Sequence, residues 1–202
     1  MYLTIGFLLF FVLILAILLI LYISRGKKSL PLKYKNDDNF NLFLKDLKLY
    51  LEHHHPKIDF NYHVIGNTIH EKKEEMRELL VIENIVEQFY NHKYQKVSQS
   101  DIPREKYWPN YIEKSNSEKL PNDWPLRKES VWRRDNKCCN RCGKVMTLDE
   151  TYTCFVKDIR SGGGYNFENI IILCVDCNKI VNLKSTYSSL TLNDKLMALI
   201  KT

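Results

Sequence analysis

Two Cys-x-x-Cys pairs place the strongest constraint on what this chain can fold into. The pairs are Cys139 with Cys142 and Cys174 with Cys177, and residues 143–173 separate them. Two thiolates spaced in this way can bind one metal ion from a tight turn, and a second pair completes a tetrahedral site of four sulfurs. Gly143 suits the left-handed backbone that such a turn needs. We therefore predict one structural zinc ion, in a closed site that supplies folding energy and no catalysis.

The cysteines leave two alternatives open. Cys138 adjoins the first pair, so a Cys138-x-x-x-Cys142 pairing is a less regular possibility. The thiols can also be unrelated buried or redox groups. Metal is favoured over disulfides where the compartment is reducing, and the rest of the sequence indicates the compartment.

Residues 5–23 form an apolar run of 19 residues without a charge. As a helix rising about 1.5 Å per residue, this run matches a hydrocarbon core of roughly 30 Å. A cleaved signal peptide would need a basic segment before the run and small residues at its end, and neither is present. We therefore expect residues 1–24 to be a transmembrane anchor.

The charges beside the run indicate its orientation. No Lys or Arg precedes it, and five follow it closely: Arg25, Lys27, Lys28, Lys33 and Lys35. Because positive flanks stay in the cytoplasm, we expect a single-pass membrane protein with its N-terminus outside and its body cytoplasmic. The cytoplasm is reducing, which favours metal at the cysteine pairs.

The remaining chain divides into four parts. Residues 25–39 are expected to be a basic linker, 40–96 a small α+β segment, 97–124 an irregular connector, and 125–202 the zinc-binding module. In the α+β segment, apolar spacing predicts a helix that ends before Pro56 and a second helix over residues 71–94. Alternation over residues 58–64 predicts a strand between them.

Three adjacent histidines, His53 to His55, lie at the end of the first predicted helix. Successive side chains of a helix point about 100° apart, so the three cannot all face one ion. Imidazoles near a helix end commonly bind its last carbonyls. A structural or solvent role is therefore favoured, and metal binding is the alternative.

Several short motifs occur in order around the cysteine pairs. An Arg134-Asp135 step precedes the first pair, and a Ser161-Gly162-Gly163 turn and a Glu168-Asn169-Ile170 step precede the second. Together, residues 125–182 resemble the zinc-containing branch of the HNH endonucleases. The resemblance implies a ββα-metal fold that binds DNA and a divalent cation. The expected fold class is thus α+β, with a single N-terminal transmembrane helix, the small α+β segment and a C-terminal zinc-stapled HNH-like module.

The catalytic positions depart from that family. In the family an Asp-His or His-His pair, one a metal ligand and the other the general base, ends the first strand shortly before the Gly-Gly turn. Here these positions are occupied by Cys154 and Phe155, or by Phe155 and Val156 in the neighbouring register. Losing a positioned base costs about 10²–10⁴-fold in rate, and the hard cation loses an oxygen ligand. The resemblance implies that the scaffold remains while the chemical groups are missing.

Three polar residues match or adjoin the rest of the family's site. Asn169 matches the family's central Asn, and Asn178 takes the place of the last metal ligand. Asp158 lies on the loop into the metal pocket and is a candidate replacement ligand. Asn169 and Asp158 are therefore the candidate catalytic residues, with Mg²⁺ or another divalent cation as cofactor only if the module is active.

Basic residues surround the first cysteine pair. Residues 130–202 carry 11 Lys and Arg against 7 Asp and Glu. Arginine and lysine neutralise phosphates, and arginine can do so with two parallel hydrogen bonds. The predicted nucleic-acid contacts are Arg133, Arg134, Arg141, Lys144 and Arg160.

These observations predict a membrane-anchored, HNH-endonuclease-like zinc-binding protein that has lost catalysis and binds DNA or RNA. One alternative is an active metal-dependent DNA endonuclease that uses replacement residues. The other is a zinc-stapled scaffold for a protein partner.

Overall fold

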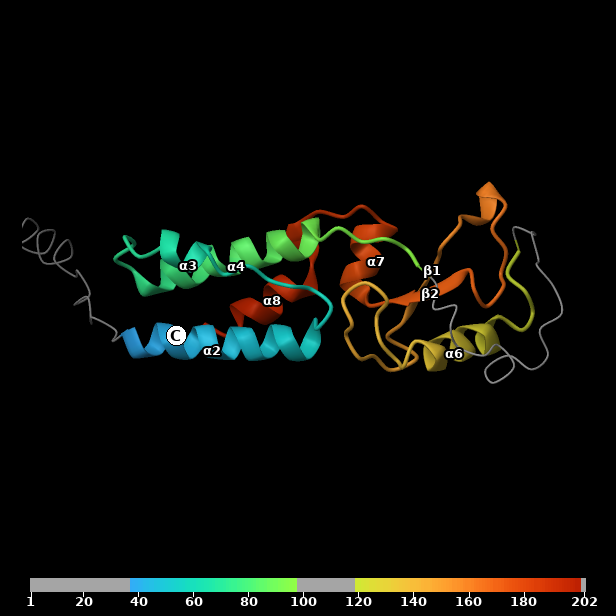
Figure 1. The fold of residues 1–202 in the computed structure, drawn as a ribbon, viewed down its shortest axis with the longest axis horizontal. Helices are drawn as coiled ribbons and strands as arrows, with labels where there is room; N and C mark the ends of the chain where they lie inside the picture. Colours follow the sequence, from blue (N-terminus) through green and yellow to red (C-terminus); the bar gives the residue numbers. More distant parts are fainter. Residues whose placement is uncertain (1–36, 98–118, 201–202) are drawn as a thin grey trace, which may run out of the picture. The chain divides into compact units, whose positions relative to one another are not determined.

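The computed structural model describes residues 37–97 and 119–200 (Figure 1). These residues form a small α+β fold with six α-helices, two short 3₁₀ helices and one sheet of two strands. The described residues belong to one compact unit that begins at Asp37.

A helical layer is built from the N-terminal part of this unit. It contains α2 (Asp37–His54), α3 (Val64–Asn67) and α4 (Glu74–Asn91). Apolar residues three or four positions apart bury one face of each long helix: Phe40, Phe43, Leu47 and Leu51 in α2, and Ile82, Ile85, Val86 and Phe89 in α4. Near the C-terminus, α8 (Thr191–Met197) packs against α4 and runs between α2 and α4 in Figure 1.

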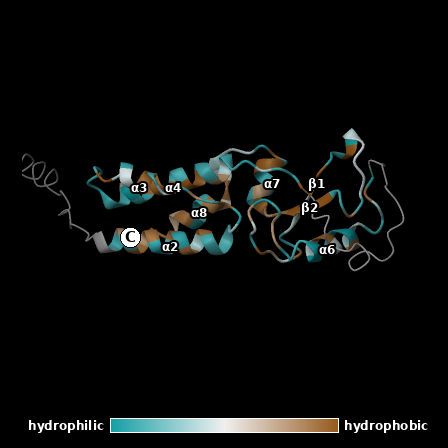
Figure 2. Ribbon diagram, in the orientation of Figure 1, coloured by the Kyte–Doolittle hydropathy of each residue, from teal (hydrophilic) through white to brown (hydrophobic). Residues whose placement is uncertain are grey.

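The second layer contains the sheet. Its elements are α6 (Trp124–Arg134), β1 (Tyr152–Phe155), β2 (Ile170–Leu173) and α7 (Val175–Val181), with the 3₁₀ helices η1 (Ile159–Ser161) and η2 (Tyr187–Ser189). The two strands are antiparallel, with Thr153 opposite Ile172. All four residues of β2 are buried, because α6 and α7 both pack against it. This explains its uninterrupted apolar sequence, which is brown in Figure 2.

Buried polar side chains fix the connections between these elements. Arg134, at the end of α6, pairs with Asp135 at 2.7 Å and donates to the carbonyl of Ile170 in β2 at 2.8 Å. Asp176 of α7 accepts hydrogen bonds from the backbone N–H groups of Thr191 and Leu192, at 2.7 and 3.0 Å. The carboxylate of α7 therefore satisfies the free N–H groups at the start of α8.

The structure corrects the predicted fold class and localisation. In the ranges 37–97 and 119–200, no helix is both long and apolar enough to cross a membrane. The two longest, α2 and α4, are amphipathic: their apolar residues face the core and charged residues occupy the other side. The single-pass membrane protein with a cytoplasmic body is thus not supported. The predicted anchor itself, residues 1–24, lies outside the described residues, as do residues 25–36 of the linker and 98–118 of the connector.

The strand predicted over residues 58–64 is also wrong. Ile58 and Phe60 are buried while Asp59 and Asn61 are exposed, so the alternation is real. However, these residues form a loop that follows α2 and leads into α3. A strand needs a partner, and β1 and β2 pair only with each other.

Candidate functional site

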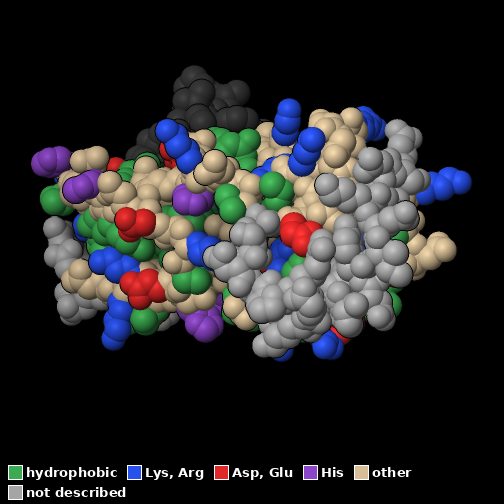
Figure 3. All heavy atoms as spheres, turned by 45° about the vertical axis from the view of Figure 1, so that its right-hand side comes forward, with side chains coloured by type: hydrophobic (Ala, Val, Ile, Leu, Met, Phe, Trp, Pro, Cys, Tyr) green, Lys and Arg blue, Asp and Glu red, His purple; other side chains and the backbone are tan. Residues whose placement is uncertain are grey.

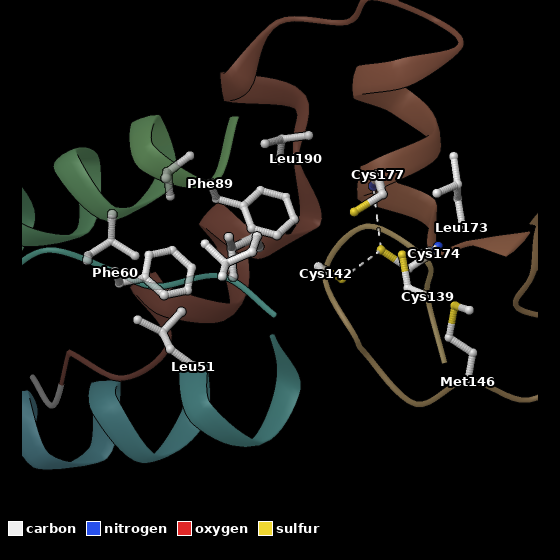
Figure 4. Close-up of a cluster of buried hydrophobic side chains, with 14 of the residues drawn as sticks. Leu51, Phe60, Phe89, Cys139, Cys142, Met146, Leu173, Cys174, Cys177 and Leu190 are labelled. Atoms are coloured by element: carbon white, nitrogen blue, oxygen red, sulfur yellow. Dashed lines mark hydrogen bonds between the residues drawn. The ribbon is translucent and has the colours of Figure 1, made fainter. Parts of the chain in front are cut away.

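The four paired cysteines converge on one buried point between the two layers (Figure 4). Their sulfur atoms all lie within 4.8 Å of one another, and the Sγ atoms of Cys142 and Cys174 are 3.8 Å apart. Four sulfurs at about 2.3 Å from a zinc ion lie roughly 3.8 Å from each other in a tetrahedron. The arrangement can therefore hold a metal ion such as zinc.

Local backbone geometry brings each pair to this point. Cys139 and Cys142 lie on a tight turn that Gly143 completes, with φ +82° and its N–H bonded to the carbonyl of Cys139 at 2.9 Å. Cys174 is the residue before α7, and its sulfur accepts from the N–H of Cys177 at 3.5 Å. Cys174 in turn donates its own N–H to the sulfur of Cys139 at 3.3 Å. Backbone donors thus point at sulfurs, as they do around thiolates.

The thiols share negative charge unequally. Burial raises the pKa of Cys139, but hydrogen bonds with the side chains of Cys142, Cys174 and Cys177 lower this pKa overall. The same hydrogen bonds with Cys139 raise the pKa values of Cys142 and Cys177. A bound dication would stabilise all four cysteines as thiolates.

The other two cysteines lie outside the cluster. The sulfur of Cys138 contacts the carbonyl of Asn136 at 3.2 Å, and that of Cys154 contacts Oδ1 of Asn182 at 3.2 Å. Across the part of the chain that the structure describes, the four paired cysteines are the one group of three or more His, Cys, Asp or Glu arranged to hold a metal. The irregular Cys138 pairing and the histidine site are therefore not formed there.

No family model, curated protein or solved structure matches this chain.

The two candidate catalytic residues lie on the glycine loop that joins β1 to β2. Asn169 is buried, and its side chain accepts from the N–H of Lys157 at 2.7 Å and donates to the carbonyls of Lys157 and Gly164 at 2.9 and 2.8 Å. Asp158 is exposed and accepts from the N–H of Arg160 at 2.8 Å, at the start of η1. Both residues hold the loop in shape, and among the described residues Asp158 belongs to no group of His, Cys, Asp or Glu that could hold a metal ion.

The predicted phosphate contacts separate into buried and accessible residues. Arg134 and Arg141 are 0% and 2% exposed, with their guanidinium groups bound to protein groups. They cannot reach a phosphate while these bonds are intact, so the prediction that Arg134 and Arg141 contact nucleic acid is wrong. Arg133 is exposed but paired with Glu129, at 2.5 Å. Lys144 is half-buried, and Arg160 is exposed on the loop.

Two functional features were missed from the sequence. Lys157 is exposed on the glycine loop, and its Nζ lies near Gly162. Its position in the sequence just before Asp158 could have indicated that it belongs to this loop. Phe155 packs against Trp124 and Tyr165, with ring centroids 6.1 and 5.6 Å away. That aromatic cluster joins three distant segments, so no local pattern could reveal it.

The histidines have a packing role. His55 is buried with its ring against Phe89, 4.9 Å between centroids, and His54 packs on Tyr50 at 4.4 Å. Burial, and then the nearby charge of Lys144, lower the pKa of His55 to about 4. His55 is therefore a neutral core residue at physiological pH.

Proposed function

We propose that this chain is a zinc-stapled, HNH-like module that has lost catalysis and binds nucleic acid through its glycine loop. The zinc ion would be held by Cys139, Cys142, Cys174 and Cys177, in a closed site with a structural role. The observation that carries the proposal is that Cys154 and Phe155 stand where, on the resemblance, an HNH endonuclease has a metal ligand and its general base.

The order of elements supports the HNH-like part of the proposal. Two antiparallel strands, β1 and β2, are followed directly by α7, which is the order that a ββα-metal fold requires. Asn169 binds the loop between the strands from within, as expected of a residue that orients the backbone of this site. The first cysteine pair precedes this unit, and the second lies between β2 and α7.

The loss of catalysis is supported by a chain of neutral groups. The thiol of Cys154 contacts Oδ1 of Asn182, and Nδ2 of Asn182 donates to Oδ1 of Asn178 at 2.7 Å. On the HNH resemblance, Cys154 and Asn178 stand where the family has metal-binding residues, the second of which is a His or an Asn. Asn178 thus keeps a residue type that the family uses, whereas Cys154 offers neither the anionic oxygen nor the imidazole that holds a catalytic cation.

The neighbouring position reinforces this view. Phe155 replaces the general base, and its ring packs against Trp124 and Tyr165, which also contact each other. An aromatic ring can neither accept a proton from water nor bind Mg²⁺. An active enzyme would need both functions from other residues.

The glycine loop offers a surface for phosphates. Lys157, Arg160, Ser161 and Gly162 are exposed there, and a glycine allows a strand to approach the backbone closely. Figure 3 shows Lys and Arg side chains (blue) spread over several margins of this face of the molecule. Lysine and arginine contacts to phosphate release counterions, so the affinity must fall as salt rises.

A salt titration of the full-length chain tests the binding. A short DNA duplex and an RNA of the same sequence are the probes, and the variant is Lys157→Glu with Arg160→Glu. The matched control is Lys72→Glu with Lys73→Glu, which makes the same charge change at exposed residues just before α4. We expect the loop variant to bind at least about tenfold more weakly with a salt slope smaller by about two, and the control to resemble the wild type. Absent or salt-insensitive binding would favour a protein-binding scaffold.

A nicking assay tests the loss of catalysis. The same protein is incubated with plasmid and Mg²⁺, Mn²⁺ or Ni²⁺, and no nicking is expected. Metal-dependent nicking that disappears in Asn169→Ala would contradict the proposal and restore the endonuclease alternative.

A further inference from the structure

The turn that carries the first cysteine pair is also where the helical layer docks. The side chain of Asn140 accepts a hydrogen bond from the hydroxyl of Tyr94 and donates to the carbonyl of Val97 at 3.3 Å. Lys57 contributes two bonds, from Nζ to the carbonyl of Asn140 and from its N–H to the carbonyl of Cys142, both 3.2 Å. Successive residues of the cysteine turn are thus held by the loop after α2 and by the segment after α4.

Gly143 adds a close backbone contact to the same junction. A Cβ atom at this position would lie 2.9 Å from Cγ of Pro56 and 3.0 Å from Cγ of Lys57. The left-handed turn and the loop after α2 therefore fit together only because residue 143 has no side chain.

Arg141 connects this junction to the metal centre directly. Its Nη2 donates to the carbonyls of Phe89, Tyr90 and His92, at 2.6, 3.3 and 3.2 Å, which are the unsatisfied carbonyls around the end of α4. Its Nη1 lies 3.6 Å from the sulfur of Cys177. Phe89 accordingly lies next to the cysteine cluster in Figure 4.

The charge of Arg141 makes this connection dependent on the cluster. Among the described residues, no carboxylate lies within ion-pair distance of this buried guanidinium, whereas buried Arg134 has Asp135. A buried cation without a counter-charge is strongly destabilising. Four thiolates around a dication carry a net charge of about −2, and Arg141 lies against one of them. A metal-loaded cluster would therefore supply the counter-charge of Arg141.

We propose that occupancy of the metal centre controls the docking of the helical layer, and that Arg141 is the positioning residue that transmits it. With metal bound, the thiolates hold Arg141, and Arg141 holds the end of α4. Without metal, the two cysteine pairs are no longer fixed to each other, Arg141 loses its fixed contact at Cys177, and the end of α4 and the loop after α2 separate from the cysteine turn. The proposal rests on metal binding and is independent of nucleic-acid binding.

Arginine variants at two buried sites test the role of Arg141. Arg141→Met and the matched control Arg134→Met each remove a buried guanidinium, but only Arg141 contacts a cysteine of the cluster. We expect Arg141→Met to weaken zinc affinity about 10–100-fold, measured by competition with a chelator, and Arg141→Lys to recover part of it. The thiolate-to-metal charge-transfer band of the Co²⁺-substituted protein should shift in Arg141→Met and stay unchanged in Arg134→Met. Equal zinc affinities and equal spectra for the two Met variants would overturn the proposal.

A milder change from the helical side provides an independent test. Coupling between two sites is reciprocal, so weakening the docking must weaken metal binding by the same factor. Tyr94→Phe deletes only the hydroxyl that binds Asn140, and Tyr187→Phe is the control on an exposed ring that packs against Tyr90. We expect zinc affinity, measured by competition with a chelator, to be several-fold weaker in Tyr94→Phe and unchanged in Tyr187→Phe. Zinc bound with identical affinity in both variants would refute the coupling alone, whereas wild-type protein without zinc would refute metal binding itself.

Discussion

Substitution of Gly163 by alanine is the sharpest test of how the glycine loop is held. A Cβ atom at this position would lie 2.1 Å from the carbonyl oxygen of Lys157 and 2.8 Å from Nδ2 of Asn169. Because the first of these atoms is backbone, the loop must open by about 1 Å to reach an ordinary contact. That movement pulls Lys157 away from Asn169, to which it is joined by hydrogen bonds of 2.7 and 2.9 Å.

The magnitude follows from these two effects. Forcing an extra carbon into a packed site costs about 1–3 kcal/mol, and each lost buried hydrogen bond costs about 1 kcal/mol. Gly163→Ala should therefore lower the free energy of unfolding by about 3–5 kcal/mol. With a urea dependence of about 2 kcal/mol per molar, the midpoint falls by roughly 2 M.

Gly162→Ala is the matched control. Gly162 has φ +83°, so alanine there is strained, but the nearest atom to its Cβ is the flexible Nζ of Lys157 at 3.6 Å. The expected cost is about 1–2 kcal/mol. Both variants are measured by urea denaturation of the zinc-loaded, full-length chain. The reasoning is refuted if Gly163→Ala is within about 1 kcal/mol of the wild type, or is less destabilised than Gly162→Ala.

Two further predictions concern the cysteines and His55. Cys174→Ser removes a proposed ligand and should abolish zinc retention and cooperative unfolding. Cys154→Ser, at a similarly buried thiol outside the cluster, should keep its zinc, and its free energy of unfolding should fall by about 1 kcal/mol. Elemental analysis and thermal unfolding measure both effects, and full zinc occupancy in Cys174→Ser would contradict the ligand assignment. His55 stays neutral in the folded state down to its lowered pKa of about 4, while the unfolded chain takes up a proton as the pH falls through 6.5. Its folded pKa is depressed, so stability is complete above pH 6.5 and decreases as the pH falls towards 4, by up to about 3 kcal/mol. The difference in unfolding free energy between the wild type and His55→Leu, followed from pH 7 to 4.5, isolates this contribution, and a pH-independent difference would show that His55 is not responsible.

Local spacing was sufficient to predict the four-cysteine cluster and the two long helices. Two residues between thiols fix a turn, and a left-handed glycine after it is a local requirement, so Cys139, Cys142 and Gly143 could be read without the fold. The helix expected before Pro56 and the one over residues 71–94 correspond to α2 and α4, because a 3.6-residue apolar period is also a local property.

Features that depend on distant contacts were not predictable in this way. The alternation over residues 58–64 has the period of a strand, but these residues join no sheet, since the one sheet of the described residues contains β1 and β2 alone. Arg134 and Arg141 were expected on the surface because isolated charges usually are, and their carbonyl partners lie 33 or more residues away in sequence. Residue type alone cannot distinguish a phosphate-binding arginine from one that holds a core together.

The predicted transmembrane anchor depended on a single segment of the sequence. It depended entirely on the run of residues 5–23, which lies outside the described residues, and no helix within residues 37–97 or 119–200 meets the length and hydropathy that a membrane span requires. The described helices obtain their stability from amphipathic packing against one shared core.

X-ray absorption at the zinc edge of the purified full-length chain, together with elemental analysis, tests the proposed four-cysteine zinc site. We expect about one zinc ion per chain with four sulfur neighbours at about 2.3 Å. Protein that is folded without zinc, or zinc bound by nitrogen and oxygen in place of sulfur, would contradict it.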